Sequence, residues 1–272
     1  MMSTTTRVSV SDVVTFYKCK ACFLERLENG RRGKQTVKSL LGEMLHELAE
    51  RCLRGEAEIM ERLYAGRCLD PRNLQRCYRK IARSTCRKVM WRYGERLIEL
   101  AGSLEDAWDL LLRASENIVR QRVLELFKNL RSIGLQQLLS QLYARSFGKR
   151  LYSEELRLCG SPDMLELDRV VEFKYSRPGP RGMVREDIVL QLALYSVLSG
   201  RKRLRVIYLP SFIHEDFQLN GVMAEWALRI LDELFDFLSN TPERVEHTCI
   251  HPPRYVNVRG ELLWAESTSS LQ

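Results

Sequence analysis

The sequence predicts an α/β protein in which a mixed central sheet is flanked by helices and interrupted by a long helical insertion. Apolar residues recur with helical spacing from 56 to 147, and at Lys149 the period changes to two, after which strands and helices alternate. The chain has 272 residues, 45% of them hydrophobic and 29% charged. That composition can bury a sizeable core, which excludes intrinsic disorder.

The N-terminal half is predicted to be helical. Residues 9–12 offer N-cap side chains ahead of an apolar stretch, and 40–54 place Leu41, Leu45 and Leu48 on one stripe. Asp70 and Pro71 form an N-cap and N1 pair that opens a helix ending near Leu100. Further helical segments are expected over 103–130 and 134–146.

The second half is predicted to carry the sheet. Residues 151–158 alternate, and 164–167 and 170–174 follow as strands around a turn at Asp168. A helix over 185–198, a strand over 204–209 and a helix over 222–238 come next, and 254–258 is expected to pair with 262–265. We therefore divide the chain into N-terminal helices (1–55), a helical insertion (56–148), a core that carries the sheet (149–240) and a C-terminal segment (241–272) that returns to the N-terminal cysteines.

The charge of the chain favours a polyanionic partner. Forty-three Lys and Arg against thirty-five Asp and Glu leave a net charge of +8. The basic residues are scattered along the sequence, so a positive face has to be assembled by folding, and the alternative is an ordinary solvated surface. No apolar run approaches the roughly 20 residues of a membrane span, and the first residues lack a signal-peptide pattern, so we expect no membrane and a cytoplasmic location.

The most informative segment lies between Gly160 and Tyr195. On a strand, Glu172 and Lys174 share one face while Phe173 points into the core, and the turn at Asp168 lets the strand after Asp163 pair back toward Glu172. Two carboxylates on one edge suit Mg²⁺ or Mn²⁺, and with a lysine beside them they suit hydrolysis of a phosphodiester. A lone Glu-x-Lys is usually a solvated ion pair; the combination with Asp163 and a following helix is more specific.

Side chains after this segment offer contacts to a nucleic acid. Gln191 and Tyr195 share one helical face and are predicted either to hold the phosphate of the strand or to support Lys174. Arg177 and Arg181 flank the break at 178–180 and either line a groove for a single strand or solubilise the loop. Trp91 and other aromatic residues of the helical block are either core or base-stacking residues.

These motifs resemble the PD-(D/E)xK nuclease superfamily, in particular its RecB-like branch with the CRISPR-associated Cas-four exonucleases. The resemblance rests on the motifs at 160–163, 172–174 and 191–195, on 42–46, which is similar to a first motif with a metal-binding histidine, and on 17–19. It covers residues 10–50 and 150–255 and implies a restriction-endonuclease-like fold. It further implies that Mn²⁺ or Mg²⁺ is bound by the following groups: His46, Asp163, Glu172 and the carbonyl of Phe173.

The same resemblance implies a function. Lys174 would handle the attacking water, while Gln191 and Tyr195 would position DNA. The activity would be that of an exonuclease on single-stranded DNA ends, trimming precursors for CRISPR spacer acquisition beside integrase proteins. Three alternatives are a non-catalytic DNA-end-binding or assembly subunit, a viral or repair nuclease, and an enzyme that processes RNA.

The cysteines depart from the pattern of this branch, whose members bind an iron–sulfur cluster through one cysteine before the core and three after it. Here Cys19 takes the first position, but only Cys249 follows Tyr195. Cys19, Cys22 and Cys249, with His247 or His251, are predicted to bind zinc or an altered cluster, or else to be cysteines without a metal.

Overall fold

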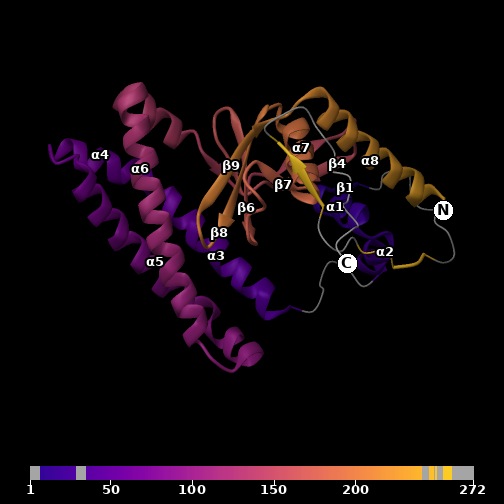
Figure 1. Cartoon of the computed structure of the whole chain (residues 1–272), viewed down its shortest axis with the longest axis horizontal. Coiled ribbons are helices and arrows are strands. Elements are labelled where there is room, and N and C mark those ends of the chain that lie inside the picture. The colour runs from indigo at the N-terminus through magenta and orange to yellow at the C-terminus, as the bar shows by residue number, and fades with distance from the viewer. Residues whose placement is uncertain (1–6, 29–34, 241–244, 248, 250–253, 259–272) are drawn as a thin grey trace.

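A five-stranded mixed sheet forms the centre of the protein in a computed structural model that describes residues 7–28, 35–240, 245–247, 249 and 254–258 (Figure 1). Its strands follow the order β2-β5-β6-β8-β9, where β6 and β8 are parallel and the other pairs antiparallel. Their bounds are β2 Ser146–Phe147, β5 Met164–Leu165, β6 Arg169–Tyr175, β8 Arg203–Leu209 and β9 Ile213–Gln218. The mixed sheet and its flanking helices confirm the predicted fold class.

Two smaller sheets complete the strand pairing. One has the order β1-β4-β3, from β1 Val8–Ser9, β4 Leu158–Gly160 and β3 Leu151–Ser153, and the other pairs β7 Met183–Arg185 with β10 Tyr255–Asn257. The backbone N–H of Glu186 also donates to the carbonyl of Arg254 at 3.0 Å. The predicted partner of 254–258, residues 262–265, lies outside the described residues; among those described, β10 pairs with β7.

Four of the described helices, α1, α3, α5 and α8, begin where a short polar side chain caps them. Ser9 and Asp12 form a capping box at the start of α1, and Asp70 accepts hydrogen bonds from the backbone N–H groups of Arg72 and Asn73 at the start of α5, as the sequence predicts. The bounds are α1 Val10–Lys18, α2 Lys20–Glu28, α3 Val37–Arg54, α4 Glu56–Ala65, α5 Pro71–Ala101, α6 Glu105–Tyr143, α7 Glu186–Ser199 and α8 Gly221–Ser239.

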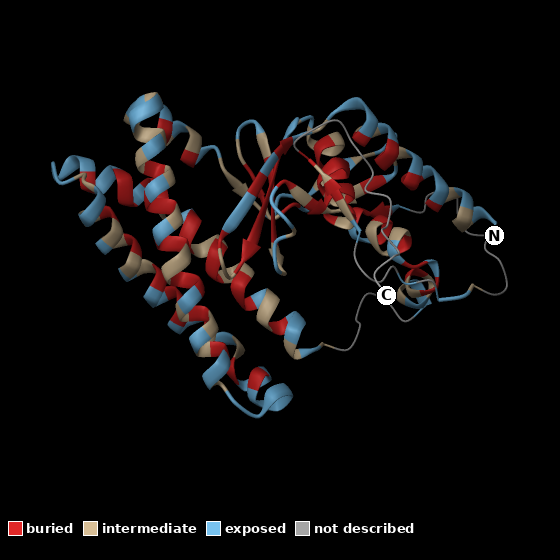
Figure 2. Ribbon diagram, viewed as in Figure 1, coloured by how far each residue is buried: buried red, intermediate tan, exposed pale blue. Residues whose placement is uncertain are grey.

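The two faces of the central sheet bury two separate cores (Figure 2). Because side chains alternate along a strand, Val171 and Phe173 of β6 pack with α3 to α6 on one face. Val170 packs with α1, α7 and α8 on the other face. Glu172 and Lys174 share the parity of Val170, so their side chains lie on the face that α7 covers.

A buried ionic network fixes the helical block to the sheet. Glu56, fully buried, accepts hydrogen bonds from Arg122 at 2.6 and 2.7 Å, from Arg145 at 2.5 Å and from the hydroxyl of Tyr78 at 2.7 Å. Burial alone would raise the pKa of Glu56, but the two arginines hold it below its ordinary value. Sequence patterns gave no signal for this network, because its members lie on elements far apart along the chain.

The structure agrees with some of the local predictions and differs from others. Residues 151–158 do not form one strand; β3 and β4 are separated by a turn in which Arg157 has φ 46°. The predicted break between 130 and 134 is confirmed within α6, where Gly134 has the non-helical φ of 75° and ψ of 168° and kinks the helix. Strand β9 and helix α2 were not expected, and β9 contains His214, whose Nε2 lies 3.6 Å from Oδ2 of Asp216.

Candidate active site

The candidate site lies beside β6, at the point where β5 begins. Strand β5 pairs only with Val170 and Val171, so the edge of β6 beyond them has no partner from β5. Asp163 stands just before β5, and its Oδ2 accepts a hydrogen bond from the backbone N–H of Phe173 at 2.6 Å. The acid is thereby fixed to the strand that carries Glu172 and Lys174, as the predicted back-pairing required.

Glu172 is the most buried acid of the site, with 4% of its surface exposed. Its Oε1 accepts hydrogen bonds from Lys174 Nζ at 3.0 Å and from Gln191 Nε2 at 2.7 Å, whereas Oε2 is buried and has no hydrogen-bond partner among the described residues. Burial and the charge of Asp163 raise the pKa of Glu172 to about 7, against the lowering influence of Lys174. Such an orphaned carboxylate oxygen is a natural ligand for a cation.

His46 reaches the two acids from α3. Its Nδ1 lies 3.3 Å from Oδ1 of Asp163, and its ring stands edge-on to Phe173, with centroids 5.7 Å apart. Burial disfavours the charged imidazolium, but Asp163 and Glu172 outweigh it and raise the pKa of His46. Two carboxylates and one imidazole make a donor set that fits Mn²⁺ or Mg²⁺.

Gln191 on α7 joins Lys174 and Glu172. Its Oε1 accepts a hydrogen bond from Lys174 Nζ at 2.6 Å while its Nε2 donates to Glu172, so both polar atoms of the amide contact the Glu-x-Lys pair. The hydroxyl of Tyr195, one helical turn later, donates to the carbonyl of Ser161 at 3.3 Å. Of the two roles open for Gln191, the contacts match support of Lys174; positioning of DNA by Gln191 and Tyr195 stays a prediction.

Gly160 allows the strand before Asp163 to lie close to Tyr195, because a larger residue would not fit at this position. A Cβ at that position would lie 2.5 Å from Cε1 of Tyr195 and 2.9 Å from a methyl group of Val10. The strand that leads to Asp163 therefore packs directly against the aromatic ring. The sequence marked Gly160 as part of the motif without indicating this contact.

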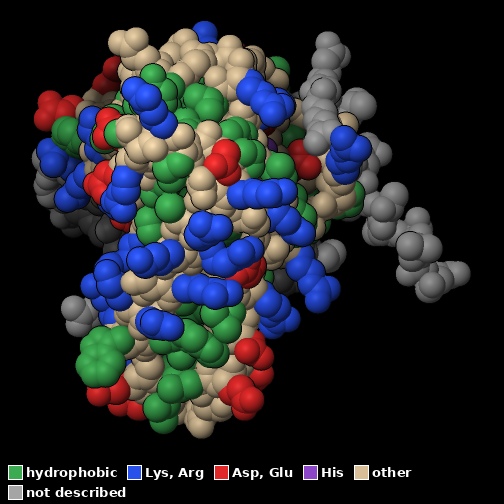
Figure 3. Space-filling model, turned by 90° about the vertical axis from the view of Figure 1, so that its left-hand side faces the viewer, with side chains coloured by type: hydrophobic (Ala, Val, Ile, Leu, Met, Phe, Trp, Pro, Cys, Tyr) green, Lys and Arg blue, Asp and Glu red, His purple; other side chains and the backbone are tan. Residues whose placement is uncertain are grey.

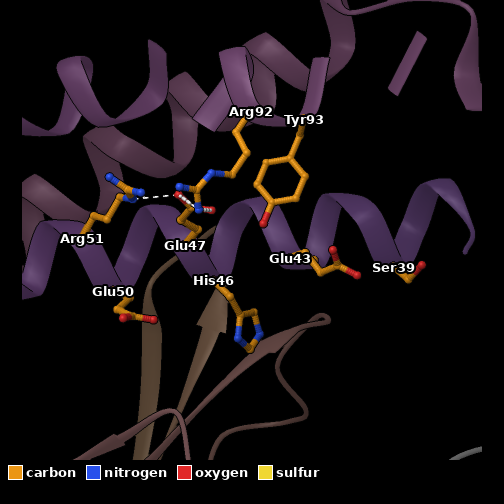
Figure 4. Close-up of a pocket in the computed structure, with 9 residues that line it drawn as sticks. Ser39, Glu43, His46, Glu47, Glu50, Arg51, Arg92 and Tyr93 are labelled. Atoms are coloured by element: carbon orange, nitrogen blue, oxygen red, sulfur yellow. Dashed lines mark hydrogen bonds and ion pairs between the residues drawn. The ribbon is translucent and has the colours of Figure 1, made fainter. Parts of the chain in front are cut away.

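Two pockets flank the site. One, of about 650 Å³, is lined by His46 and by residues of α3 and α5, with Glu47 held by Arg51 at 2.7 Å and by Arg92 at 3.0 Å. In Figure 4, His46 points away from these charged groups toward the strands. The other, of about 590 Å³, follows the end of β6 and is lined by Arg177 together with Lys38 and Arg113, but by no acidic residue. Arg181 is exposed and does not line either of these two pockets.

The predicted cysteines come together at a second place. The ligand atoms of Cys19, Cys22, His247 and Cys249 all lie within 4.8 Å of one another. Nδ1 of His247 is 3.8 Å from Sγ of Cys19 and 3.7 Å from Sγ of Cys22, which is 3.7 Å from Sγ of Cys249. Three sulfurs and one nitrogen can hold a metal ion or a cluster. The alternative ligand His251 lies outside the described residues.

Comparison with known proteins agrees with this geometry. A model of the PD-(D/E)XK nuclease superfamily matches residues 7–216, and the chain belongs to this superfamily. Membership indicates a nuclease, a hydrolase that works with divalent metal ions on a nucleic acid. Among the described residues, no helix is long and apolar enough to span a membrane.

Comparisons with individual proteins add less. No curated protein matches the chain. A solved structure described as "Crystal structure of SSO0001" is 17% identical, with a TM-score of 0.28, and the match covers 48% of this chain and 67% of that one.

Proposed function

We propose that the protein hydrolyses phosphodiester bonds of DNA at single-stranded ends, with Mn²⁺ or Mg²⁺ held by His46, Asp163 and Glu172 and by the carbonyl of Phe173. The observation that carries the proposal is the buried Oε2 of Glu172, which lacks a hydrogen-bond partner among the described residues beside Asp163 and His46. Burying a carboxylate oxygen without a partner is unfavourable, and a cation at this position would offset that penalty.

The residues of the site divide the chemical work. When bound, the metal ion supplies a Lewis acid that lowers the pKa of water and neutralises phosphate charge. Lys174, held by Glu172 and Gln191, keeps its ammonium at the edge of β6, where it orients the attacking water and offsets the charge of the leaving oxygen. Arg177 lines an acid-free pocket directly after this strand and is suited to contact the phosphate of the bound strand; the exposed Arg181 is a weaker candidate.

The test is hydrolysis of a labelled single-stranded DNA with Mn²⁺ or Mg²⁺, beside matched duplex DNA and RNA. We expect Glu172→Gln and Lys174→Ala to lose at least about a hundredfold in rate, within the range for losing a general acid–base group. The exposed Glu155→Gln and Lys202→Ala are the matched controls and should keep the wild-type rate. Wild-type rates in the first pair would disprove the catalytic assignment. Binding without turnover in any metal would favour a DNA-end-binding subunit. Preferred cleavage of RNA would make RNA, rather than DNA, the substrate.

A place in CRISPR spacer acquisition is the narrower proposal and rests on the motif resemblance to the Cas-four exonucleases. It is tested by mixing the purified protein with an integrase complex and unprocessed spacer precursors. The proposal would be supported if the protein trims the precursors to a length that can be integrated and if this trimming requires Glu172. Equal integration with and without the protein would favour a viral or repair role.

We propose that the cysteine and histidine group binds a single Zn²⁺ ion. Tetrahedral Zn–S bonds of about 2.3 Å and Zn–N bonds of about 2.0 Å place sulfur atoms about 3.8 Å apart and sulfur and nitrogen about 3.5 Å apart. The distances of 3.7 and 3.8 Å around His247 and Cys22 match these edges, whereas a cluster of several irons spreads its ligands farther. Stoichiometric zinc in a colourless protein would support the proposal, and a brown protein absorbing near 400 nm would replace it with iron–sulfur.

A further inference from the structure

Helix α5 carries almost the whole net charge of the protein. Between Pro71 and Ala101 it has nine Lys or Arg and two Asp or Glu, a net charge of +7, against +8 for the entire chain. The neighbouring α6 has five basic and five acidic side chains and is neutral. The sequence left undecided whether folding gathers the basic residues on one face. One helix of the helical block, α5, provides such a face.

The charges of α5 lie on its solvent side. Its buried face, which includes Leu74, Tyr78, Ala82 and Val89, packs into the core of the helical block. The opposite face carries a row spaced by three or four residues, which we call the α5 stripe: Arg72, Arg76, Lys80, Arg83 and Arg87, all exposed. Figure 3 shows Lys and Arg side chains gathered on this end of the molecule. With a rise of 1.5 Å per residue, the stripe is about 22 Å long.

Most of these charges have no acidic partner. Of the α5 stripe, only Arg83 makes an ion pair within the described part of the chain, with Glu116 at 3.5 Å. Arg72 and Arg76, Arg76 and Lys80, and Arg83 and Arg87 are like charges at i and i+4, a spacing that destabilises a helix. Arg72 also stands in a first turn without an acidic residue, against the helix dipole. A polyanion along the stripe would relieve each of these repulsions.

An exposed aromatic residue connects the stripe to the catalytic region. Trp91 lies one turn beyond Arg87 on the same face and is 91% exposed, although the pattern allowed it to be a core residue. The next two residues, Arg92 and Tyr93, line the pocket that also contains His46. A large aromatic side chain this exposed, between a basic row and a catalytic centre, is suited to stacking on a base.

We propose that the α5 stripe binds the phosphodiester backbone of the nucleic acid outside the catalytic centre, with Trp91 stacking on a base beside it. The inference deepens the proposed function, since it takes the polyanion to be the substrate of the nuclease. From Arg72 to Trp91 the surface extends about 28 Å, enough for about eight base pairs of a duplex. A lipid surface fits poorly, because the apolar face of α5 is buried in the helical block.

The test is affinity measured by fluorescence anisotropy without divalent metal ions, so that no turnover is involved. The variant is Lys80→Gln with Arg87→Gln, compared with Lys202→Gln and Arg229→Gln, which remove the same two charge types from exposed positions on other elements. Losing two phosphate contacts lowers the salt slope, log Kd against log salt, by about 1.8 for a duplex and 1.4 for a single strand. The affinity should fall by about 15- to 30-fold near 0.15 M salt, and the control should be unchanged.

Single-stranded and duplex oligonucleotides of about 25 nucleotides identify the form bound. The form with the larger loss is the one that lies on the stripe, and equal losses mean that the backbone of either form suffices. In the unaltered protein, oligonucleotide should quench part of the tryptophan emission, and Trp91→Ala should abolish this quenching. This readout does not depend on how the charge variant folds. An unchanged salt slope, an equal loss in the control pair, or binding only to anionic lipid vesicles would overturn the inference, whether or not the protein hydrolyses DNA.

Discussion

Lys174 Nζ lies 2.6 Å from Oε1 of Gln191, a contact that joins the catalytic strand β6 to helix α7. The amide of Gln191 is the group that holds both the lysine and Glu172, although it is placed to touch no reacting atom itself. We therefore expect Gln191 to act as a positioning residue, and replacing it tests the geometry of the site rather than its charge.

Gln191→Leu should lower kcat by about 10- to 100-fold, as loss of a group that orients metal ligands usually does. KM should change little, because neither polar atom of Gln191 is free to bind substrate in the metal-free protein. Steady-state hydrolysis of single-stranded DNA measures both constants. Gln137→Leu, at an exposed position of α6, is the control. A rise in KM with an unchanged kcat would instead make Gln191 a residue that holds DNA.

Metal affinity should depend on pH through Glu172. Its pKa of about 7 in the metal-free protein means that it is largely protonated below neutrality, and His46 has a raised pKa as well. Because a cation binds the ionised carboxylate and the neutral imidazole, affinity for Mn²⁺ should rise as pH increases and level off above about 7 to 8. Calorimetric titration between pH 5.5 and 8.5 measures this. Affinity that is flat over that range would contradict the assignment of these two ligands.

Glu56→Gln should destabilise the protein by about 3 kcal/mol, since it removes one of the two acidic partners of each buried arginine and leaves Arg122 with Glu125 and Arg145 with Glu166. Urea unfolding measures the change, and Glu58→Gln, exposed on the same helix, should have a negligible effect. The lowered pKa of Glu56 determines how its contribution to the free energy of unfolding changes with pH. Its contribution is complete above the unfolded pKa of about 4.3 and is lost as pH falls through the folded value, so the difference from Glu56→Gln should shrink in acid.

Gly160→Ala should affect stability and catalysis together, because the added methyl group meets Tyr195 and Val10 at less than 3 Å. We expect a loss of about 1 to 3 kcal/mol from overpacking, and a lower kcat as the strand before Asp163 moves. Thermal unfolding and hydrolysis rates are the measurements. Gly221→Ala, at a helical position with nothing within 4 Å, should be neutral or slightly stabilising. Unchanged behaviour of the first variant would show that the strand can shift without consequence.

The sequence was most informative where the chemistry depends on local spacing. The two-residue period placed Glu172 and Lys174 together, the helical period placed Gln191 near Tyr195, and the Cys-x₂-Cys pattern indicated Cys19 and Cys22. These relations follow from the geometry of a single element, which residue spacing encodes directly.

Contacts between distant elements were harder to predict. Only the family resemblance linked His46 to Asp163, since nothing in the spacing brings α3 to β5. The network around Glu56 had no sequence signal, and the pattern left Trp91 open between a core and a base-stacking residue, because burial also depends on what packs beside a helix. Strand β9 was missed because its segment is short and polar, with His214 and Asp216 on its exposed side.

The pairing of β10 with β7 ties the last described residues to catalysis. Val256 lies opposite Val184, and Arg254 accepts from the first N–H group of the helix that later presents Gln191. A chain truncated before Arg254 would leave that amide unsatisfied and release the strand immediately ahead of α7. Residues 254–258, to which no catalytic role is assigned, would thus support Lys174 of β6 through the start of the helix that holds it.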